Sequence, residues 1–344
     1  MNWKTGAATA AMAILAFTGS AAAEGELNIF NWGDYTNPEL IKKFEAAHNV
    51  KVTVTDYDSN DTALAKVRAG GHGFDIVVPS ANYVPIWVKE GLLLEARPDQ
   101  MENFKNVDER WVNVHWDEGR HYTVPWQWGL SGIGVNTKVY GGDINTSAIF
   151  LDPPAELVGK INVEPEMTDV LFATIKYFGG DWCTEDKELL KKVRDKLLEA
   201  KPKWLAMDYS VTEKLPAGDY AAVYYWNGAI LRSRIKNPDI KFGYPKEGYP
   251  LFMDSVAILK DAKNPENAKL FMNFIMDPEN AALISAFAKY SNGIKGSDAF
   301  LPADMKDAPE LTAPAEFEKA GEFLTTCSPE TSALYTRIWT DINK

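Results

Sequence analysis

Strand-like and helix-like segments alternate along the first part of the chain, and this alternation restricts the possible folds more than any other feature. The strand-like segments are Leu27–Phe30, Lys51–Tyr57 and Phe74–Val78. The segments between them have the apolar spacing of helices, and Asn37-Pro38 supplies an N-cap and a first-turn proline to the first of them. Strands that alternate with helices predict an α/β fold, and the unbroken apolar run of the third strand is typical of a parallel sheet.

A second α/β section follows Gly141-Gly142, and the length of 344 residues is typical of two domains. Gly129–Asn136 just before it is a glycine-spaced apolar strand, and the stretch from Pro98 to Pro125 is rich in loops. The further predicted elements are the helices Val170–Tyr177, Lys187–Ala200, Pro265–Met276 and Pro278–Ala288 and the strands Tyr220–Tyr225 and Pro250–Leu259. No low-complexity linker separates the halves, which indicates two lobes joined by more than one crossing of the chain.

The first 23 residues have the pattern of a secretory signal peptide. Lys4 precedes an apolar stretch of about 11 residues, too short for the roughly 20 that span a membrane, and Ala21 and Ala23 fit the cleavage pattern. We therefore expect cleavage after Ala23 and export to the periplasm. In an exported protein Cys183 and Cys327, the only two cysteines, can form a disulfide or remain two isolated thiols, and the sequence leaves both possibilities open.

Charge and motif content exclude several classes of function. The chain has 36 basic and 48 acidic residues, and it lacks the concentrated basic face that a nucleic-acid partner requires. Its four histidines do not have metal-ligand spacing, and it contains no Gly-x-Ser-x-Gly nucleophile motif. We therefore expect neither a metal nor a cofactor, and a protein that is not an enzyme.

Aromatic and acidic residues gather at the ends of predicted strands, where open α/β sheets bind ligands. They are Trp32, Asp34, Ser80, Tyr83, Trp226, Phe252 and Asp254. Aromatic faces attract a cation, and a buried carboxylate such as Asp254, inside an apolar strand, needs a cation or hydrogen-bond donors. Together they predict a site for an amine-bearing ligand. Alternatives remain for three kinds of residue: the tryptophans could be core, Asp34 a turn cap, and Ser80 the N-cap of the next helix.

The same residues resemble the spermidine/putrescine-binding proteins of ABC importers, from Leu27 to about Trp339. The motifs that carry the resemblance are Phe30–Tyr35, Phe74–Ser80, Pro125–Asn136, Trp226–Gly228 and Phe252–Ser255. The resemblance implies a monomeric type II periplasmic binding protein that closes on its ligand and docks on a membrane permease. In it each lobe is a mixed sheet flanked by helices, one of residues 24–132 with 256–302 and the other of 133–255 with 303–344. By that similarity the ligand contacts include Trp32, Asp34, Ser80, Trp226, Phe252, Asp254 and Tyr290.

The sequence also departs from the polyamine pattern, because the positions of two further acids correspond to Val170 and Ala229. Asp169 could substitute for the first, although one residue along a helix turns a side chain by about 100°. Arg232 lies three residues after Ala229, which puts the two on the same face of a helix, and it could hold a carboxylate there. The alternative is that Arg232 is a solvated surface residue. We therefore predict an ω-amino acid such as 4-aminobutyrate (GABA), with its ammonium on Asp254 and its carboxylate on Arg232 or a neighbouring residue.

Two alternative ligands remain. Putrescine or spermidine is the close alternative, because Asp254 keeps one amine-binding end. Ferric iron is a distant one, since Tyr224-Tyr225 resembles the tyrosine pair of periplasmic iron-binding proteins. Successive strand residues point to opposite faces, so at least one of these two tyrosines should be core.

Overall fold

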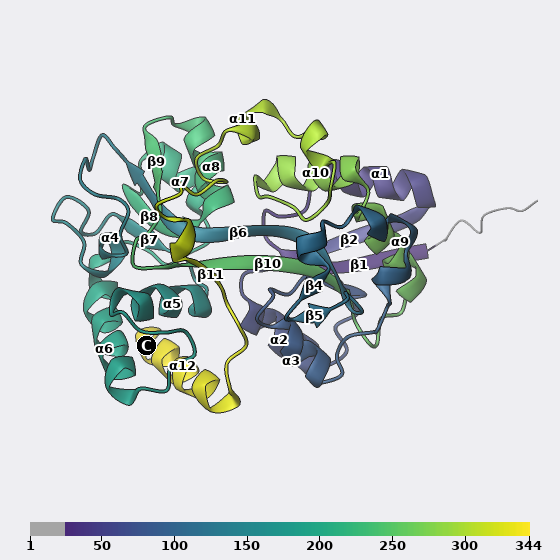
Figure 1. Ribbon diagram of the computed structural model, residues 1–344, viewed down its shortest axis with the longest axis horizontal. Helices are drawn as coiled ribbons and strands as arrows, with labels where there is room; N and C mark the ends of the chain where they lie inside the picture. The colour runs from purple at the N-terminus through teal and green to yellow at the C-terminus, as the bar shows by residue number, and fades with distance from the viewer. Residues whose placement is uncertain (1–24) are drawn as a thin grey trace, which may run out of the picture.

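Two long strands run through the middle of the molecule and connect its two halves. In the computed structural model, which describes residues 25–344, β6 (Thr123–Asn136) and β10 (Tyr249–Ile258) cross from one group of helices to the other (Figure 1). The half that contains β1–β3 is here called the first lobe, and the half that contains β7–β9 the second lobe. The predicted signal peptide, residues 1–23, lies outside the described residues.

The strands form one nine-stranded mixed sheet in the order β2-β1-β3-β10-β6-β8-β7, with β11 paired to β10 and β9 to β6. The parallel pairs are β1 with β2 and with β3, β7 with β8, and β10 with β11. The central strands β10 and β6 are antiparallel, and β10 is also antiparallel to β3. The remaining strands are β1 (Gly25–Trp32), β2 (Val50–Tyr57), β3 (Ile76–Val77), β7 (Ile161–Val163), β8 (Ala222–Trp226), β9 (Ile240–Gly243) and β11 (Gly321–Phe323).

Helices cover both ends of this sheet (Figure 1). Those beside the first-lobe strands are α1 (Pro38–His48), α2 (Asn60–Arg68), α3 (Val84–Lys89), α9 (Pro265–Ile275) and α10 (Pro278–Ala288). Those of the second lobe are α4 (Ala148–Leu151), α5 (Met167–Tyr177), α6 (Lys187–Ala200), α7 (Val211–Ala217), α8 (Asn227–Lys236), α11 (Ala303–Lys306) and α12 (Pro329–Ile342). The predicted α/β class with two lobes and a mixed sheet is therefore confirmed.

The loop-rich region before Pro125 contains short turns rather than regular elements. It holds three 3-10 turns, at residues 98–100, 102–106 and 109–111, and a small hairpin of β4 (Asn113–Val114) and β5 (Asp117–Glu118). Three further 3-10 turns follow later in the chain, at 201–203 after α6, at 297–300 and at 318–320.

Local sequence signals place most helix ends correctly. The Asn37 side chain accepts a hydrogen bond from the Glu39 backbone N–H, with Pro38 in the first turn, as predicted for an N-cap. The prediction that Ser80 caps the next helix is wrong. Tyr83 is at the N-cap of α3 without a side-chain cap bond. Ser80 lies three residues earlier, where its hydroxyl donates to Asp254 and accepts from the Asn60 side-chain amide.

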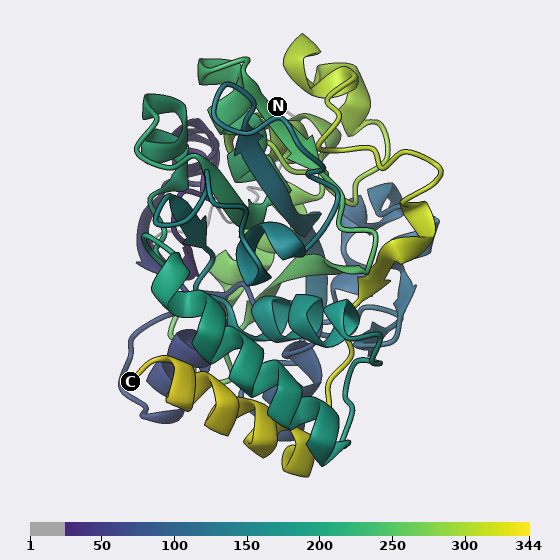
Figure 2. The same ribbon diagram turned by 90° about the vertical axis from the view of Figure 1, so that its left-hand side faces the viewer.

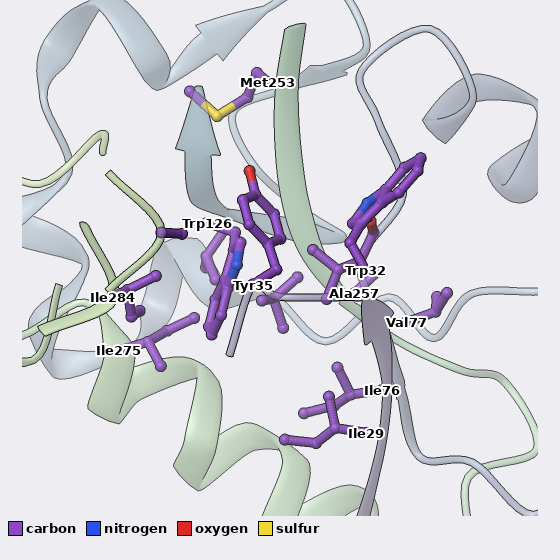
Figure 3. Close-up of a cluster of buried hydrophobic side chains, with 14 of the residues drawn as sticks. Ile29, Trp32, Tyr35, Ile76, Val77, Trp126, Met253, Ala257, Ile275 and Ile284 are labelled. Carbon is purple, nitrogen blue, oxygen red and sulfur yellow. The ribbon is translucent and has the colours of Figure 1, made fainter. Parts of the chain in front are cut away.

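The molecule contains two large apolar clusters: one fills the first lobe and continues into α7, β8 and α8 of the second lobe, and the other lies within the second lobe. Figure 3 shows the first-lobe part of the larger cluster, where Ile29 and Ile76 lie side by side on the paired strands β1 and β3 and Ile275 comes from α9. The second-lobe core is separate, and its fully buried members include Leu171 and Val193. The predicted lobe boundaries fall inside β6 and β10 and stay a prediction.

A disulfide settles the question that the two cysteines left open. Cys183, in the loop between α5 and α6, is bonded to Cys327, just before α12, with their Cα atoms 5.2 Å apart. The bond holds the start of α12 against the second lobe, where this helix lies alongside α6 (Figure 2). Within residues 25–344, no helix combines the length and the apolar character needed to cross a membrane.

Candidate functional site

A cavity lies between the lobes, beside the point where β10 crosses. Eight of the nine residues predicted to bind ligand line it: Trp32, Asp34, Ser80, Trp226, Arg232, Phe252, Asp254 and Tyr290. The ninth, Tyr83, does not. Its hydroxyl donates to Asp61, and its side chain lines a neighbouring cleft between the lobes.

Asp254 is the acid on the β10 side of the cavity, and it is 4% exposed. The Ser80 hydroxyl donates to one carboxylate oxygen at 2.6 Å, and the Tyr35 hydroxyl donates to the other at 2.9 Å. The pairing of β10 with β6 shifts register between Asp254 and Ser255, at the same point of the strand. Burial raises the pKa of Asp254 to about 7, although the two hydroxyl groups oppose this shift. A carboxyl in this state gains most from a cation placed beside it.

A second group of buried acids lines the cavity from the second lobe. Asp169, in the first turn of α5, accepts hydrogen bonds from the Ser131 hydroxyl at 2.8 Å and the Trp226 indole N–H at 3.2 Å. Glu166, just before α5, accepts from the Thr168 hydroxyl at 3.1 Å. Burial raises the pKa of Asp169, and it raises the pKa of Glu166 to about 8.

This arrangement corrects the sequence argument that an anionic position is lost. Asp169 faces the cavity, whereas Val170 is fully buried in the second-lobe core. Glu164, which the sequence analysis did not single out, lies behind Asp169 and is fully buried. Burial and the neighbouring charge of Asp169 raise the pKa of Glu164 well above its usual range. The second lobe therefore keeps an acidic end of the cavity.

Aromatic side chains form the walls between the two acidic ends. Trp32 is the last residue of β1, and Tyr35 lies in the turn that follows it (Figure 3). The Trp32 indole N–H donates to the Val78 carbonyl at 2.9 Å. Ring centroids are 6.3 Å apart for Trp32 and Trp226, and 5.6 Å for Phe252 and Tyr290. Both tryptophans are less than one-tenth exposed and also line the cavity, so they belong to the core and to the site at once.

Arg232 is the cation of the cavity lining, not a solvated surface residue. It lies on α8 one turn after Ala229, and its guanidinium donates across the lobes to the Asp34 carbonyl at 3.3 Å. Its buried Nε has no hydrogen-bond partner among residues 25–344. Asp34 itself has a left-handed backbone, with φ of 54°, in the turn after β1.

The tyrosine pair of β8 is divided between two roles. The Tyr224 hydroxyl donates to the Asp169 carbonyl, and the side chain packs in the second-lobe core. Tyr225 lines the cavity, and its hydroxyl, in the part of the chain that the structure describes, has no partner. Opposite faces for successive strand residues explain the division, and the same described region contains no cluster of three or more metal-ligating side chains.

Several cavity residues lie outside the predicted set. Tyr35 follows the end of a predicted strand, so its strand-end position could have indicated it. Glu166 follows β7 (Ile161–Val163), a strand that the sequence analysis did not predict. Tyr209 and Leu324 come from loops far from any predicted strand end, and tertiary packing brings them to the cavity. Nothing in their local sequence distinguishes them from other loop residues.

Comparison with known proteins gives one consistent family. The family model described as "Bacterial extracellular solute-binding protein" matches residues 39–313. The putrescine-binding periplasmic protein SpuD of Pseudomonas aeruginosa is 28% identical, over 94% of this chain and 93% of the relative. A solved structure titled as a putative spermidine/putrescine ABC transporter from Listeria monocytogenes superposes with a TM-score of 0.87 at 26% identity, over 92% of this chain and 98% of that one.

A GABA receptor, Atu4243, also has this fold. Its TM-score is 0.72 at 16% identity, over 93% of this chain and 98% of that one, a likeness that shows the fold alone.

Proposed function

The chain belongs to the bacterial extracellular solute-binding proteins, and on that premise we propose that it is the periplasmic receptor of an ABC importer for a small amine. The observation that carries the proposal is the set of three buried carboxyl groups, Asp254, Asp169 and Glu166, around one aromatic-walled cavity. The receptor binds its ligand by closing the lobes over it, without covalent chemistry, and presents both lobes to a membrane permease.

Electrostatics favours a ligand with more than one amine. Burying three carboxyl groups against a single guanidinium is costly unless a cation enters, as the raised pKa values of all three acids indicate. One ammonium bonds to Asp254, and a second lies between Asp169 and Glu166. Aromatic faces add about 0.5–2 kcal/mol for each cation that they contact. Putrescine and related polyamines have this chemistry, and the names of the relatives support the same class.

An ω-amino acid such as 4-aminobutyrate is the second candidate, and Arg232 is the observation that favours it. A guanidinium N–H can only donate, so its unpartnered Nε fits a ligand acceptor and repels an ammonium. The Tyr225 hydroxyl, also unpartnered, could donate to the same acceptor. The second acidic end makes a diamine the better-supported ligand, which reverses the order that the sequence favoured.

Calorimetry with four-carbon ligands tests the proposal. Putrescine, 4-aminobutyrate and 1-butylamine share a chain length and differ only in the second end. We expect putrescine to bind most tightly and 1-butylamine at least tenfold more weakly, because it cannot use Asp169 and Glu166. Tighter binding of 4-aminobutyrate would select the second candidate, and binding of none of the amines would contradict the proposed function.

The location and the assembly state have simple tests. Cell fractionation followed by N-terminal sequencing should find the protein in the periplasm, starting at Glu24. Size-exclusion chromatography with light scattering should give a monomer.

A further inference from the structure

The segment Phe323–Cys327, here called the strap, links both lobes to the cavity within five residues. Phe323 packs on Trp111 of the first lobe, with ring centroids 5.6 Å apart. Leu324 is buried and lines the ligand cavity. Cys327 is bonded to Cys183 of the second lobe. The strap therefore contacts both lobes beside the central strands, and its first residue, Phe323, pairs with Leu251 of β10.

One hydrogen bond joins the strap to the loop that supports the site. The Thr326 hydroxyl donates to the Asn82 carbonyl at 2.6 Å. Asn82 lines the cavity, and Ser80, two residues before it, donates to Asp254. Separation of the lobes pulls on this bond, because Thr326 follows the second lobe and Asn82 belongs to the first.

The second lobe anchors the strap on both sides of Thr326. The Trp182 indole N–H donates to the Thr325 carbonyl at 2.9 Å, and the disulfide fixes Cys327. Glu185 then accepts from the hydroxyl groups of Ser328 and Thr331, at 3.2 and 2.9 Å, where α12 begins. These anchors come from one short loop, so the position of Thr326 depends on that loop.

We propose that Thr326 is a positioning residue that holds the lobes closed over the ligand, and that the Cys183–Cys327 disulfide keeps it opposite Asn82. The proposal rests on the proposed function only in requiring that ligand is bound between the lobes, and it is independent of which amine is bound. The strap acts mainly on ligand release, because the Thr326–Asn82 bond must break before the lobes separate. A disulfide that merely stabilised the second lobe would change thermal stability and leave release unaffected.

Stopped-flow fluorescence of the cavity tryptophans measures the dissociation rate of putrescine. We expect Thr326→Val to raise this rate about fivefold, the effect of one net hydrogen bond. Thr326→Ser keeps the hydroxyl and should restore the rate to within about twofold of wild type. Thr340→Val is the matched control, since that hydroxyl bonds only to the Thr336 carbonyl within α12. An unchanged rate in Thr326→Val would overturn the proposal.

Removal of the disulfide should act through Thr326. Reduction of the wild type, or the double substitution Cys183→Ser with Cys327→Ser, should also raise the dissociation rate, and adding Thr326→Val should then have little further effect. Fully additive effects, or an unchanged rate after reduction, would refute the role of the disulfide.

Hydrogen exchange of the unliganded protein separates this proposal from the proposed function. Loss of the strap bond should speed exchange at the amides of residues 82–84 in both the reduced protein and Thr326→Val. Faster exchange in a protein that binds no amine would support the strap and reject the ligand class. Normal amine binding with unchanged rates of ligand release and hydrogen exchange would support the ligand class and overturn the proposed role of the strap.

Discussion

Replacing Asp254 by Asn tests the central assumption about the site, because it removes the charge and keeps the shape. The carboxylate accepts two hydroxyl donors and, in the complex, a ligand ammonium. Removing one partner of a buried, hydrogen-bonded charge pair costs about 2–5 kcal/mol, which corresponds to roughly a 30-fold to several-thousand-fold weaker dissociation constant. Asp254→Asn should therefore weaken both putrescine and 4-aminobutyrate by at least 30-fold, since each places an ammonium there.

The same substitution should stabilise the unliganded protein at high pH. The pKa of Asp254 is about 7 in the folded protein, against about 3.9 in an unfolded chain, so the folded state binds this proton more tightly. Ionisation of Asp254 therefore lowers the free energy of unfolding as pH rises from about 4 to about 7, by an amount on the order of 3–4 kcal/mol. Asn carries no charge, so the variant avoids this loss.

Two assays check these expectations together. Calorimetry gives the dissociation constants, and urea unfolding gives stability at pH 5 and pH 8. We expect the variant to be more stable than wild type at pH 8, with the difference reduced to about a third at pH 5. Asp181→Asn is the control, because it makes the same charge change on a fully exposed side chain. A variant that binds putrescine as wild type does, or that is less stable at pH 8, would refute the reasoning.

Three further predictions concern selectivity and pH. Asp169→Asn and Glu166→Gln should each weaken putrescine by about tenfold or more and 1-butylamine by little, because only a diamine reaches the second acidic end; equal losses for both ligands in calorimetry would contradict this. Arg232→Gln should raise the ratio of putrescine to 4-aminobutyrate affinity by about tenfold or more, and an unchanged ratio would show that Arg232 does not contact ligand. Putrescine affinity should fall as pH drops below about 7–8, by up to about tenfold per unit for each acid, since protons compete with the ammonium groups at Asp254 and Glu166; fluorescence titrations from pH 5.5 to 8.5 would reveal a flat profile if this is wrong.

Candidate site residues could be identified from the sequence where a polar or charged side chain stands in an apolar element. Asp254 is an acid within an apolar strand, a placement that is costly without a compensating partner, and the structure puts it at the cavity. Helix bounds could also be predicted from the sequence where the capping residues and the apolar spacing indicated the same ends. Lys187–Ala200 and Pro278–Ala288 have in the structure the bounds predicted for them.

Roles that depend on the direction of a side chain were not accessible in the same way. The choice between Asp169 and Val170 turns on about 100° of helix rotation, which packing of the whole second lobe decides. Ser80 could equally cap a helix or bond to an acid, and the distant strand β10 supplies that acid. Leu324 reaches the cavity through β11 and the disulfide, and neither pairing is written in its local sequence.

The shared sheet has a mechanical consequence for how a ligand is selected. Asp254 sits on β10 beside its pairing with β6 and bridges Ser80, so we expect it to lie close to the axis about which the lobes turn. Points near a pivot move little, whereas Asp169 and Glu166 on the second lobe travel along a wider arc. One end of a ligand thus binds to Asp254, which moves little, and the other end contacts Asp169 and Glu166 only as the second lobe closes. On the proposed function, we therefore expect amines that share one end to be discriminated as the second lobe closes, not at first contact.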